Sequence, residues 1–357
     1  MRIVVRGTNW IGDAVMTVPA IRALRSSFPD SHIALHTRSW AEGIFRDADF
    51  IDEIIGYDED GTALRNAVTQ GRVLREKAFD IAVLFPNSFE SALAAKFARI
   101  PKRYGYSREG RRIVLTDPVA VPNWKNKKHE VFYYLNLVEE IESRILGRKT
   151  KSKEPLIDIP VSLERRHEAR KQLQNFGVDV SKKTIAFGVG STNSRAKRWL
   201  PENYARLNDM VRRELDANVV LVGSRNETSV AEKVAGIAKL KPLMLAGRTK
   251  LDEAVAILSE VDMLVSNDMG LAHLAPAVGT RTLVIFGPTN PQTTAPFSPW
   301  AEIIREEVEC SPCMLRDCPI DHRCMTRISV NDVFERVKDL LAKEFAQGPA
   351  AGQVRQI

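Results

Sequence analysis

The chain opens with the residues MRIVVRGTNWIGDAVMTVPAIRALRSSF, numbered 1–28. Ile3-Val4-Val5 is a short run of apolar β-branched residues, which is typical of a strand buried inside a parallel sheet. A loop with two glycines follows, and apolar residues then recur at helical spacing as far as Phe28. Pro19 stands inside this helical pattern and should bend the helix or tighten its first turns. A strand, a glycine loop and a helix in this order predict the first unit of an α/β fold.

The same unit starts again near the middle of the chain. Thr184-Ile185-Ala186-Phe187 reads as a strand, residues 188–193 form a second glycine-rich loop, and a helix is expected from Pro201 onward. Strand-like and helical segments then alternate as far as Phe286. Because 357 residues exceed the range in which one hydrophobic core keeps growing, we expect two doubly wound α/β domains. Ligands of such folds bind at the carboxyl ends of the strands, so a cleft should lie where the two domains face each other.

The predicted boundaries follow from composition. A polar, charged stretch with two prolines, residues 147–160, ends the first domain, which we place at 1–160. The second domain is expected at 161–330, followed by a C-terminal helix at 331–346. The last residues, 347–357, contain Gly, Pro and Ala and should form a frayed tail.

Charge indicates the class of partner. The formal net charge is +7, which favours anionic ligands such as phosphates, nucleotides or acidic lipid head groups without selecting one of them. Basic residues gather in two segments, 99–112 and 125–129, for which a solvated surface is the alternative interpretation. The N-terminus shows no leader pattern and no run approaches ~20 apolar residues, so we expect a cytoplasmic protein.

Four cysteines fall in one short segment, with the spacing C-x2-C-x4-C-x5-C from Cys310 to Cys324. A reduced cytoplasm favours free thiols over disulfides. A compact set of four cysteines can also bind zinc, although the second pair departs from the usual C-x2-C knuckle. Free thiols are our preferred interpretation, and a structural metal site and disulfides remain open.

One polar motif stands at the end of a predicted strand, in residues 266–273 (SNDMGLAH). Gly270 lets the backbone turn into a helix, and the free amides of a helix start suit a diphosphate. An ordinary N-cap made by Asn267 or Asp268 is the alternative.

Two further loops are candidate ligand sites. Residues 188–193 contain G-x-G but lack the third glycine of a dinucleotide-binding loop, and Lys197 follows as a cation that can reach a phosphate. A simple surface lysine is the alternative. In the first loop, Asp13 stands at a helix start, where it can serve as a general base or merely as an N-cap.

Taken together, three motifs resemble those of the ADP-heptose:lipopolysaccharide heptosyltransferases, glycosyltransferase family nine. They are residues 10–20 (WIGDAVMTVPA), residues 197–201 (KRWLP), and residues 266–273 together with 287–291 (GPTNP). The region from Cys310 to Pro319 looks most like the second heptosyltransferase. The resemblance implies a GT-B fold, with two Rossmann-like doubly wound domains, an N-terminal one for the acceptor and a C-terminal one for the ADP-sugar.

The resemblance also implies roles for individual positions. Asp13 matches the catalytic base. Met269 departs from the hydroxyl residue often found at its position, which puts a hydrogen bond from it in doubt. The matching donor-binding positions are Thr192, Lys197, Glu227, Thr249, Asp268, Met269, Gly270 and His273. Lys197 and Thr192 would contact the diphosphate near Gly270 and His273, Asp268 the heptose hydroxyls, Glu227 the adenosine ribose, and Thr249 the adenine.

The expected reaction is a single inverting displacement that transfers heptose from ADP-heptose to the first heptose of the lipid A-Kdo-heptose acceptor. It needs no cofactor and no metal. From the basic segments, Arg103, Arg108, Arg111 and Lys127 are the candidates for acceptor contacts. The anionic inner-membrane surface is expected as a peripheral partner, and nucleic acid is not. Alternatives are a first or third heptosyltransferase, a nucleotide-dependent oxidoreductase, which the missing G-x-G-x-x-G disfavours, and a non-catalytic nucleotide-binding module.

Overall fold

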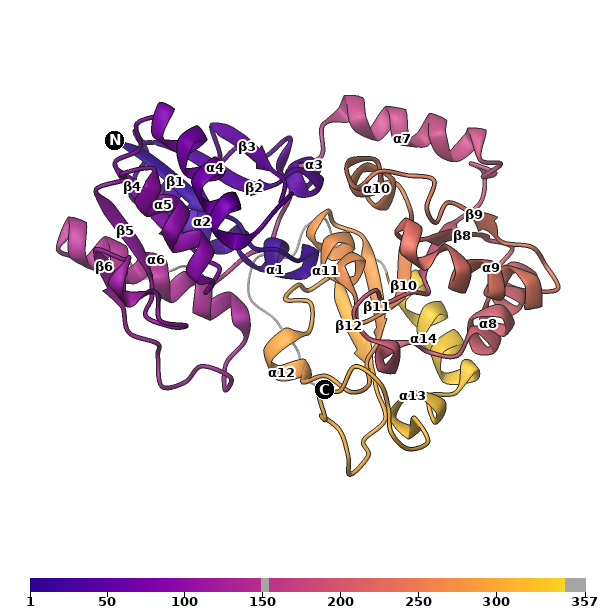
Figure 1. The fold of residues 1–357 in the computed structure, drawn as a ribbon. Helices are drawn as coiled ribbons and strands as arrows, with labels where there is room; N and C mark the ends of the chain where they lie inside the picture. The colour runs from indigo at the N-terminus through magenta and orange to yellow at the C-terminus, as the bar shows by residue number, and fades with distance from the viewer. Residues whose placement is uncertain (149–153, 344–357) are drawn as a thin grey trace. The chain divides into compact units, whose positions relative to one another are not determined.

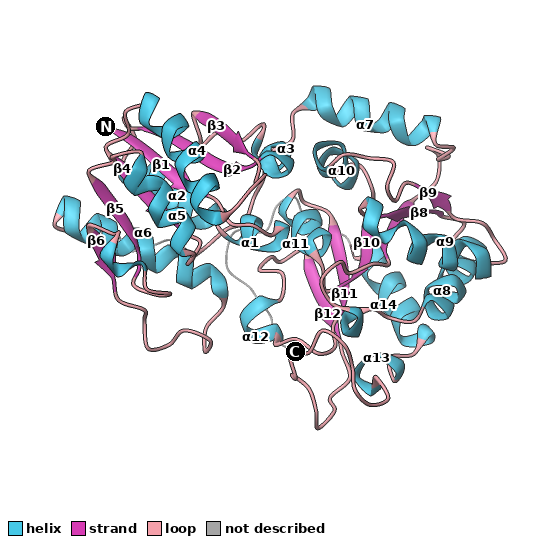
Figure 2. Cartoon of the chain, in the orientation of Figure 1, coloured by secondary structure: helices cyan, strands magenta, loops and turns pink. Residues whose placement is uncertain are grey.

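The chain folds into two compact units, Met1–Ile159 and Pro160–Ile357. The computed structural model describes residues 1–148 and 154–343. Each unit is built around its own six-stranded parallel sheet with helices packed against it (Figures 1 and 2). The predicted α/β class with two doubly wound sheets is confirmed.

In the first unit, the strands lie in the order β3-β2-β1-β4-β5-β6. They are β1 (Arg2–Arg6), β2 (His32–Arg38), β3 (Glu53–Tyr57), β4 (Ile81–Leu84), β5 (Lys102–Tyr106) and β6 (Asp117–Val119). The helices are α1 (Ile11–Met16), α2 (Val18–Ser27), α3 (Glu42–Phe45), α4 (Ala63–Glu76), α5 (Phe89–Phe97) and α6 (Glu130–Leu146). Helices α4 and α5 cover the sheet face that carries Val4 and Ala82, and α2 packs against α6.

In the second unit, the order is β12-β11-β10-β7-β8-β9. The strands are β7 (Thr184–Gly188), β8 (Asn218–Val222), β9 (Leu243–Met244), β10 (Met263–Asn267), β11 (Arg281–Ile285) and β12 (Ala301–Ile304). The helices are α7 (Leu163–Asn175), α8 (Pro201–Glu214), α9 (Thr228–Ile237), α10 (Leu251–Leu258), α11 (Gly270–Ala277), α12 (Pro291–Thr294), α13 (Arg323–Thr326) and α14 (Val330–Ala342). Side chains of α8, α9 and α14 share one core cluster with the strands of this sheet, and α11 packs on β10 and β11.

Both sheets have the same topology. Counted within its own unit, each sheet has the order 3-2-1-4-5-6 when read from the appropriate edge, which is the Rossmann order. The strand order reverses between β1 and β4 in the first unit and between β7 and β10 in the second. Ligands of open α/β sheets bind beyond the carboxyl ends of the strands at such a reversal. The loops that follow β1, β7 and β10 are therefore the places to look for a site.

The expected bend at Pro19 is a break between two helices. Helix α1 ends at Met16, α2 begins at Val18, and Pro19 lies in the first turn of α2. Proline is favourable there because a first-turn amide has no helical partner in any case. The Thr17 hydroxyl donates to the Ala14 carbonyl (2.6 Å) at the break.

The helices that end each unit stop at defined residues, and the last helix is shorter than predicted. Helix α6 ends at Leu146, where Gly147 adopts a left-handed conformation (φ 66°) that glycine favours. The C-terminal helix, expected at 331–346, ends at Ala342, and its apolar side chains belong to the core of the second unit instead of forming a separate segment. Residues 344–346 and the predicted tail, 347–357, lie outside the described residues. None of the described helices has the length and apolar character needed to cross a bilayer.

Candidate functional site

Asn267 ties the carboxyl end of β10 to two parts of the connection between β7 and α8 in the second unit. It is wholly buried, and its Oδ1 accepts hydrogen bonds from the Trp199 amide (2.9 Å) and the Tyr204 hydroxyl (3.1 Å). Its Nδ2 donates to the carbonyls of Val189 and Gly190, both at 2.9 Å. One amide side chain therefore ties the end of β10 to the glycine loop after β7 and to the segment that follows Lys197. Sequence reasoning offered Asn267 only as an N-cap, and that alternative is wrong.

A charged group forms directly beside it. The Lys197 ammonium lies 2.7 Å from Oδ2 of Asp268, and the Thr289 hydroxyl donates to the same oxygen (2.6 Å). Asp268 is only 4% exposed, so its charge is compensated by a cation and a hydroxyl donor in place of water. The structure thus brings together two residues predicted to bind the nucleotide sugar, Lys197 and Asp268, which come from separate loops. Thr289 was part of a quoted motif, but sequence reasoning gave it no role.

Helix α11 begins at Gly270 without a side-chain cap. Its N-cap is Met269, whose backbone is extended and whose side chain makes no capping hydrogen bond. The first amides of a helix need acceptors, and the helix dipole makes that end attractive to an anion. The start of α11, next to Lys197 and Asp268, therefore has the chemistry of a phosphate site. His273 lies in the next turn of α11 and is buried.

Glu227 occupies a buried position beside the glycine loop. Its Oε2 accepts from the amide and the hydroxyl of Ser224, both at 2.8 Å, in a capping box. Its Oε1 is buried and has no hydrogen-bond partner among the described residues. A Cβ on Gly190 would stand 2.4 Å from that oxygen, so only glycine permits this approach. An acceptor oxygen held in this way suits a ligand hydroxyl.

The two remaining predicted threonines lie nearer the surface. Thr192 is exposed on the loop after β7. Thr249 is half-buried in the turn before α10, and that turn is joined to the loop after β8 by a hydrogen bond from the Gly247 amide to the Gly223 carbonyl (2.9 Å). Thr249 and Glu227 therefore belong to neighbouring loops.

In the first unit, Asp13 stands in the first turn of α1. The N-cap of α1 is Trp10, so Asp13 is not the N-cap that the alternative interpretation supposed. The Tyr134 hydroxyl, from α6, donates to Oδ1 of Asp13 (3.3 Å). Burial, followed by the nearby Asp13 carboxylate, raises the pKa of the Tyr134 phenol well above its ordinary value, so the phenol stays a donor at neutral pH. Asp13 is half-buried and oriented by a fixed donor, as a general base needs to be.

Comparison with known proteins identifies the family. The model of glycosyltransferase family 9 (heptosyltransferase) matches residues 68–323. The chain belongs to this family. It is 30% identical to lipooligosaccharide heptosyltransferase 2 of Haemophilus influenzae, over 96% of this chain and 100% of that protein. It is 29% identical to lipopolysaccharide heptosyltransferase 2 of Escherichia coli, over 97% of this chain and 100% of that protein.

A solved structure agrees with this assignment. The structure of E. coli ADP-heptose lps heptosyltransferase II superposes with a TM-score of 0.82 at 27% identity, covering 96% of this chain and 98% of that one. The predicted likeness to the second heptosyltransferase is confirmed, and the chain is a heptosyltransferase of lipopolysaccharide biosynthesis.

Two of the four residues predicted to contact the sugar acceptor of this heptosyltransferase, Arg111 and Arg103, form hydrogen bonds within the protein. Arg111 is wholly buried, and its guanidinium donates to the carbonyls of Tyr106 and Pro86 and to Oδ1 of Asn87. Burial lowers the pKa of Arg111 to about 10, which leaves it charged at neutral pH. The prediction of an acceptor role is therefore wrong for Arg111, since its donors face the protein interior.

Arg103 is used in a similar way, because its guanidinium donates to the carbonyls of Val114 (2.9 Å) and Ile100 (2.6 Å). Arg108 and Lys127 are exposed. For Arg103, which is half-buried, and for Arg108 and Lys127 the acceptor contact stays a prediction.

A buried arginine in the first unit was not singled out from the sequence. Arg6 ends β1, and its Nη1 donates to Oε1 of Gln70 (2.7 Å) and to Nδ1 of His36 (3.0 Å) while its guanidinium lies 3.6 Å from the centre of the Tyr57 ring. The Tyr57 hydroxyl donates to Oδ1 of Asn9 (3.1 Å). Burial, then the Arg6 charge, lowers the pKa of His36, so this ring stays neutral and can accept. The cluster fixes the loop that leads to Asp13. An arginine closing an otherwise apolar strand is the sequence signal for it.

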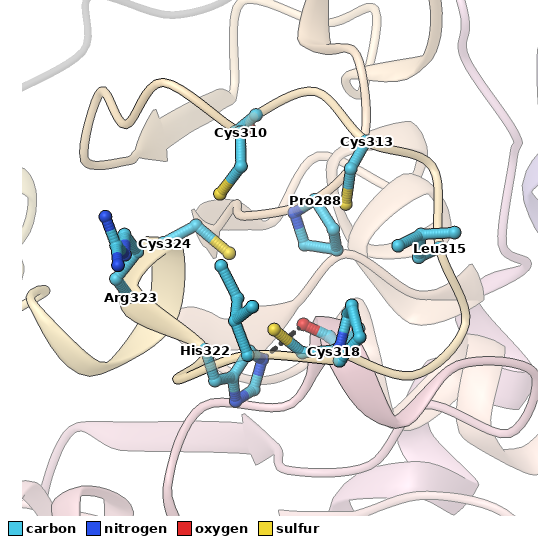
Figure 3. Close-up of a pocket in the computed structure, with 12 residues that line it drawn as sticks. Pro288, Cys310, Cys313, Leu315, Cys318, His322, Arg323 and Cys324 are labelled. Atoms are coloured by element: carbon cyan, nitrogen blue, oxygen red, sulfur yellow. Dashed lines mark hydrogen bonds between the residues drawn. The ribbon is translucent and has the colours of Figure 1, made fainter.

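The four cysteines are all free thiols in the structure, and they line one pocket (Figure 3). Burial, followed by the other three thiols, raises the pKa of Cys324 to about 11. Within residues 1–148 and 154–343, no group of three or more His, Cys, Asp or Glu side chains is arranged so that it could hold a metal ion as it stands.

Proposed function

We propose that this family 9 enzyme transfers heptose from ADP-heptose to the first heptose of the lipopolysaccharide inner core, with inversion at the anomeric carbon. The observation that carries the proposal is the group of Lys197, Asp268 and Thr289 at the start of α11. It combines a cation and uncapped amides for a diphosphate with an oriented carboxylate for sugar hydroxyls. The name of the E. coli structure, an ADP-heptose lps heptosyltransferase II, supports the choice of donor.

The second unit is assigned to the donor. The diphosphate accepts from the first amides of α11 and from the Lys197 ammonium, with Thr192 and His273 beside it. Lysine has three N–H donors, so Lys197 can keep its bond to Asp268 while it also contacts a phosphate oxygen. The carboxylate of Asp268 accepts from heptose hydroxyls. Oε1 of Glu227 accepts from a ribose hydroxyl, and Thr249 lies at the adenine.

The first unit, approximately residues 1–160, is assigned to the acceptor. Asp13 takes the proton of the attacking heptose hydroxyl while the bond between the anomeric carbon and ADP breaks. Negative charge then grows on the leaving phosphate, where the α11 amides and Lys197 stabilise it more strongly than in the ground state. One displacement inverts the anomeric centre, and the reaction uses no nucleophilic side chain.

The acceptor is a lipid, lipid A-Kdo-heptose, with phosphates and carboxylates near the attacking sugar. The exposed cations Arg108 and Lys127 suit these anions. We place the enzyme at the cytoplasmic face of the inner membrane, bound peripherally through the same charge. A first or third heptosyltransferase would share the donor site and differ in the acceptor.

Nucleotide preference tests the donor assignment. Calorimetry should show that ADP binds more tightly than UDP or GDP, because the proposed contact near Thr249 is made to the adenine, whereas the ribose contact of Glu227 is common to all three nucleotides. The matched variant Glu227→Gln retains an acceptor oxygen but loses the charge, so ADP should bind more weakly, and binding of UDP, which carries the same ribose, should weaken by a similar factor. UDP binding equal to or tighter than ADP binding in the wild-type protein would refute the assignment.

Lys197→Ala should weaken donor binding and slow transfer. The lost charge-assisted contact to the diphosphate is worth about 1.5–3 kcal/mol, a factor of roughly 10 to 150 in kcat/KM for ADP-heptose. Steady-state kinetics measure it. Lys182→Ala is the control, because this lysine pairs with Asp216 on the surface of the same unit. If Lys197→Ala and Lys182→Ala have the same kinetics, Lys197 is only a structural partner of Asp268.

A further inference from the structure

The four cysteines surround one small cavity in the second unit. Cys310, Cys313 and Cys318 come from the long loop after β12, and Cys324 lies on α13. The cavity measures about 70 Å³, and Figure 3 shows the four sulfur atoms on its walls. Cys310 and Cys313 are exposed, whereas Cys324 is buried. Four thiol groups, from residues spread over 14 positions of sequence, therefore face the same cavity.

The remaining walls make this cavity a poor site for an organic ligand and a suitable one for a soft cation. Pro288, Leu315, Pro319 and Ile320 form an apolar shell. The one full positive charge on the wall, Arg323, is already paired with Asp321 (3.0 Å) and Glu309 (3.6 Å). Four thiolates in an apolar shell match the ligand sets of tetrahedral zinc or iron sites.

We propose that this pocket is a structural metal site, in which the thiolates of Cys310, Cys313, Cys318 and Cys324 bind one zinc or ferrous ion. Binding exchanges four S–H bonds for four metal–sulfur bonds and releases four protons, with no change of oxidation state. The sulfurs must move inward from the positions that line the cavity. Binding therefore requires rotation about χ1 and a shift of the loop segment that carries the exposed Cys310 and Cys313.

The segment that contains the cysteines also forms hydrogen bonds with the two loops that carry Lys197 and Thr289. The Ala196 amide donates to the Arg316 carbonyl (2.9 Å), and Nε2 of His322 donates to the Ala196 carbonyl (2.6 Å). On the other loop, the Met314 amide donates to the Pro288 carbonyl (2.8 Å), and the Ser311 hydroxyl donates to the Gly287 carbonyl (2.7 Å).

Ala196 and Pro288 also line the cavity itself. A bound ion would therefore fix the residues that precede Lys197 and Thr289 in the chain. The effect of the ion on the loops of Lys197 and Thr289 rests on the proposed donor site, whereas the metal site itself does not depend on that proposal.

Metal content tests the site directly. The full-length protein is purified with a phosphine reductant, incubated with zinc or ferrous ion under argon, desalted, and analysed by inductively coupled plasma mass spectrometry. We expect one ion per chain, and cobalt substitution should add sulfur-to-cobalt charge-transfer absorption. The double variant Cys310→Ser/Cys313→Ser changes two exposed side chains and should lose both signals. Met314→Ser, an exposed change in the same loop outside the cavity wall, should keep them.

Three results would overturn the metal site: wild-type protein that retains no ion after either incubation, a double variant that retains a full ion, or a disulfide between Cys310 and Cys313 that persists in the folded protein in the presence of the phosphine reductant. Circular dichroism and the melting curve establish that each variant is folded. Chelation of the wild-type ion should lower the Tm and raise the KM for ADP-heptose. An unchanged KM would remove the link to the donor loops and leave the metal site standing. Failure of the proposed heptosyl transfer would leave the metal stoichiometry as predicted, so the two failures are distinguishable.

Discussion

Asp13→Asn is expected to lower kcat by about 10²–10⁴-fold, the usual cost of losing a general base. The substitution keeps the size of the side chain and an acceptor oxygen for the Tyr134 hydroxyl, so the contact at 3.3 Å can persist. It removes the carboxylate that we propose as the acceptor of the proton from the attacking hydroxyl. ADP affinity should not change, because the groups assigned to the nucleotide belong to the second unit.

The measurement is kcat at saturating ADP-heptose and heptosylated acceptor, with ADP calorimetry and a melting curve on the same preparation. Asp30→Asn is the matched control, since Asp30 is an exposed carboxylate in the turn after α2. A folded Asp13→Asn enzyme with kcat near that of Asp30→Asn would exclude the base role. Asp13 would then be a first-turn carboxylate that only stabilises α1.

Asp268→Asn is expected to lower kcat/KM for ADP-heptose by about 100-fold or more. The carboxylate is proposed to accept from two sugar hydroxyls, and each charge-assisted bond is worth about 1.5–3 kcal/mol. The variant also leaves the Lys197 ammonium without its counter-charge at 2.7 Å, and removing one partner of a buried ion pair is destabilising. The Tm should therefore fall together with the activity.

A variant of a surface ion pair is the control for the loss of stability in Asp268→Asn, as distinct from its loss of sugar binding. Lys182 and Asp216 form a pair at 2.5 Å, but Asp216 retains 79% of its side-chain exposure. Asp216→Asn should leave both the Tm and the kinetics near wild-type values, because solvent and salt screen an exposed ion pair and it contributes little to stability. If Asp268→Asn keeps full kcat/KM while its Tm falls, Asp268 is a structural residue and the sugar contact must be reassigned.

Most of the fold could be predicted from the strand–loop–helix pattern that occurs twice in the sequence. Ile3-Val4-Val5 and Thr184-Ile185-Ala186-Phe187 are too apolar for any position but a covered parallel strand, and both prove to be central strands beside a reversal of strand order. The loops after those strands could therefore be predicted as candidate site loops from the sequence.

Side-chain partnerships were harder to predict than strands. Arg111 looked like one cation among several in a basic segment, but its guanidinium closes a set of backbone carbonyls in the interior. Thr289 lies 21 residues from Asp268 and meets it only because β10 and β11 are neighbours in the sheet. Local spacing carries no information on such contacts, since they depend on which strands pair.

Transfer to defined acceptors tests the central claim most directly. The purified enzyme is incubated with ADP-heptose and with two lipopolysaccharide acceptors, one truncated before the first heptose and one that carries it, and the products are analysed by mass spectrometry and by NMR of the new anomeric bond. We predict that one heptosyl residue is added to the acceptor that carries the first heptose, with inverted anomeric configuration, and that the heptose-free acceptor is left unchanged. Transfer to the heptose-free acceptor, retention of configuration, or no transfer to either acceptor would contradict the account.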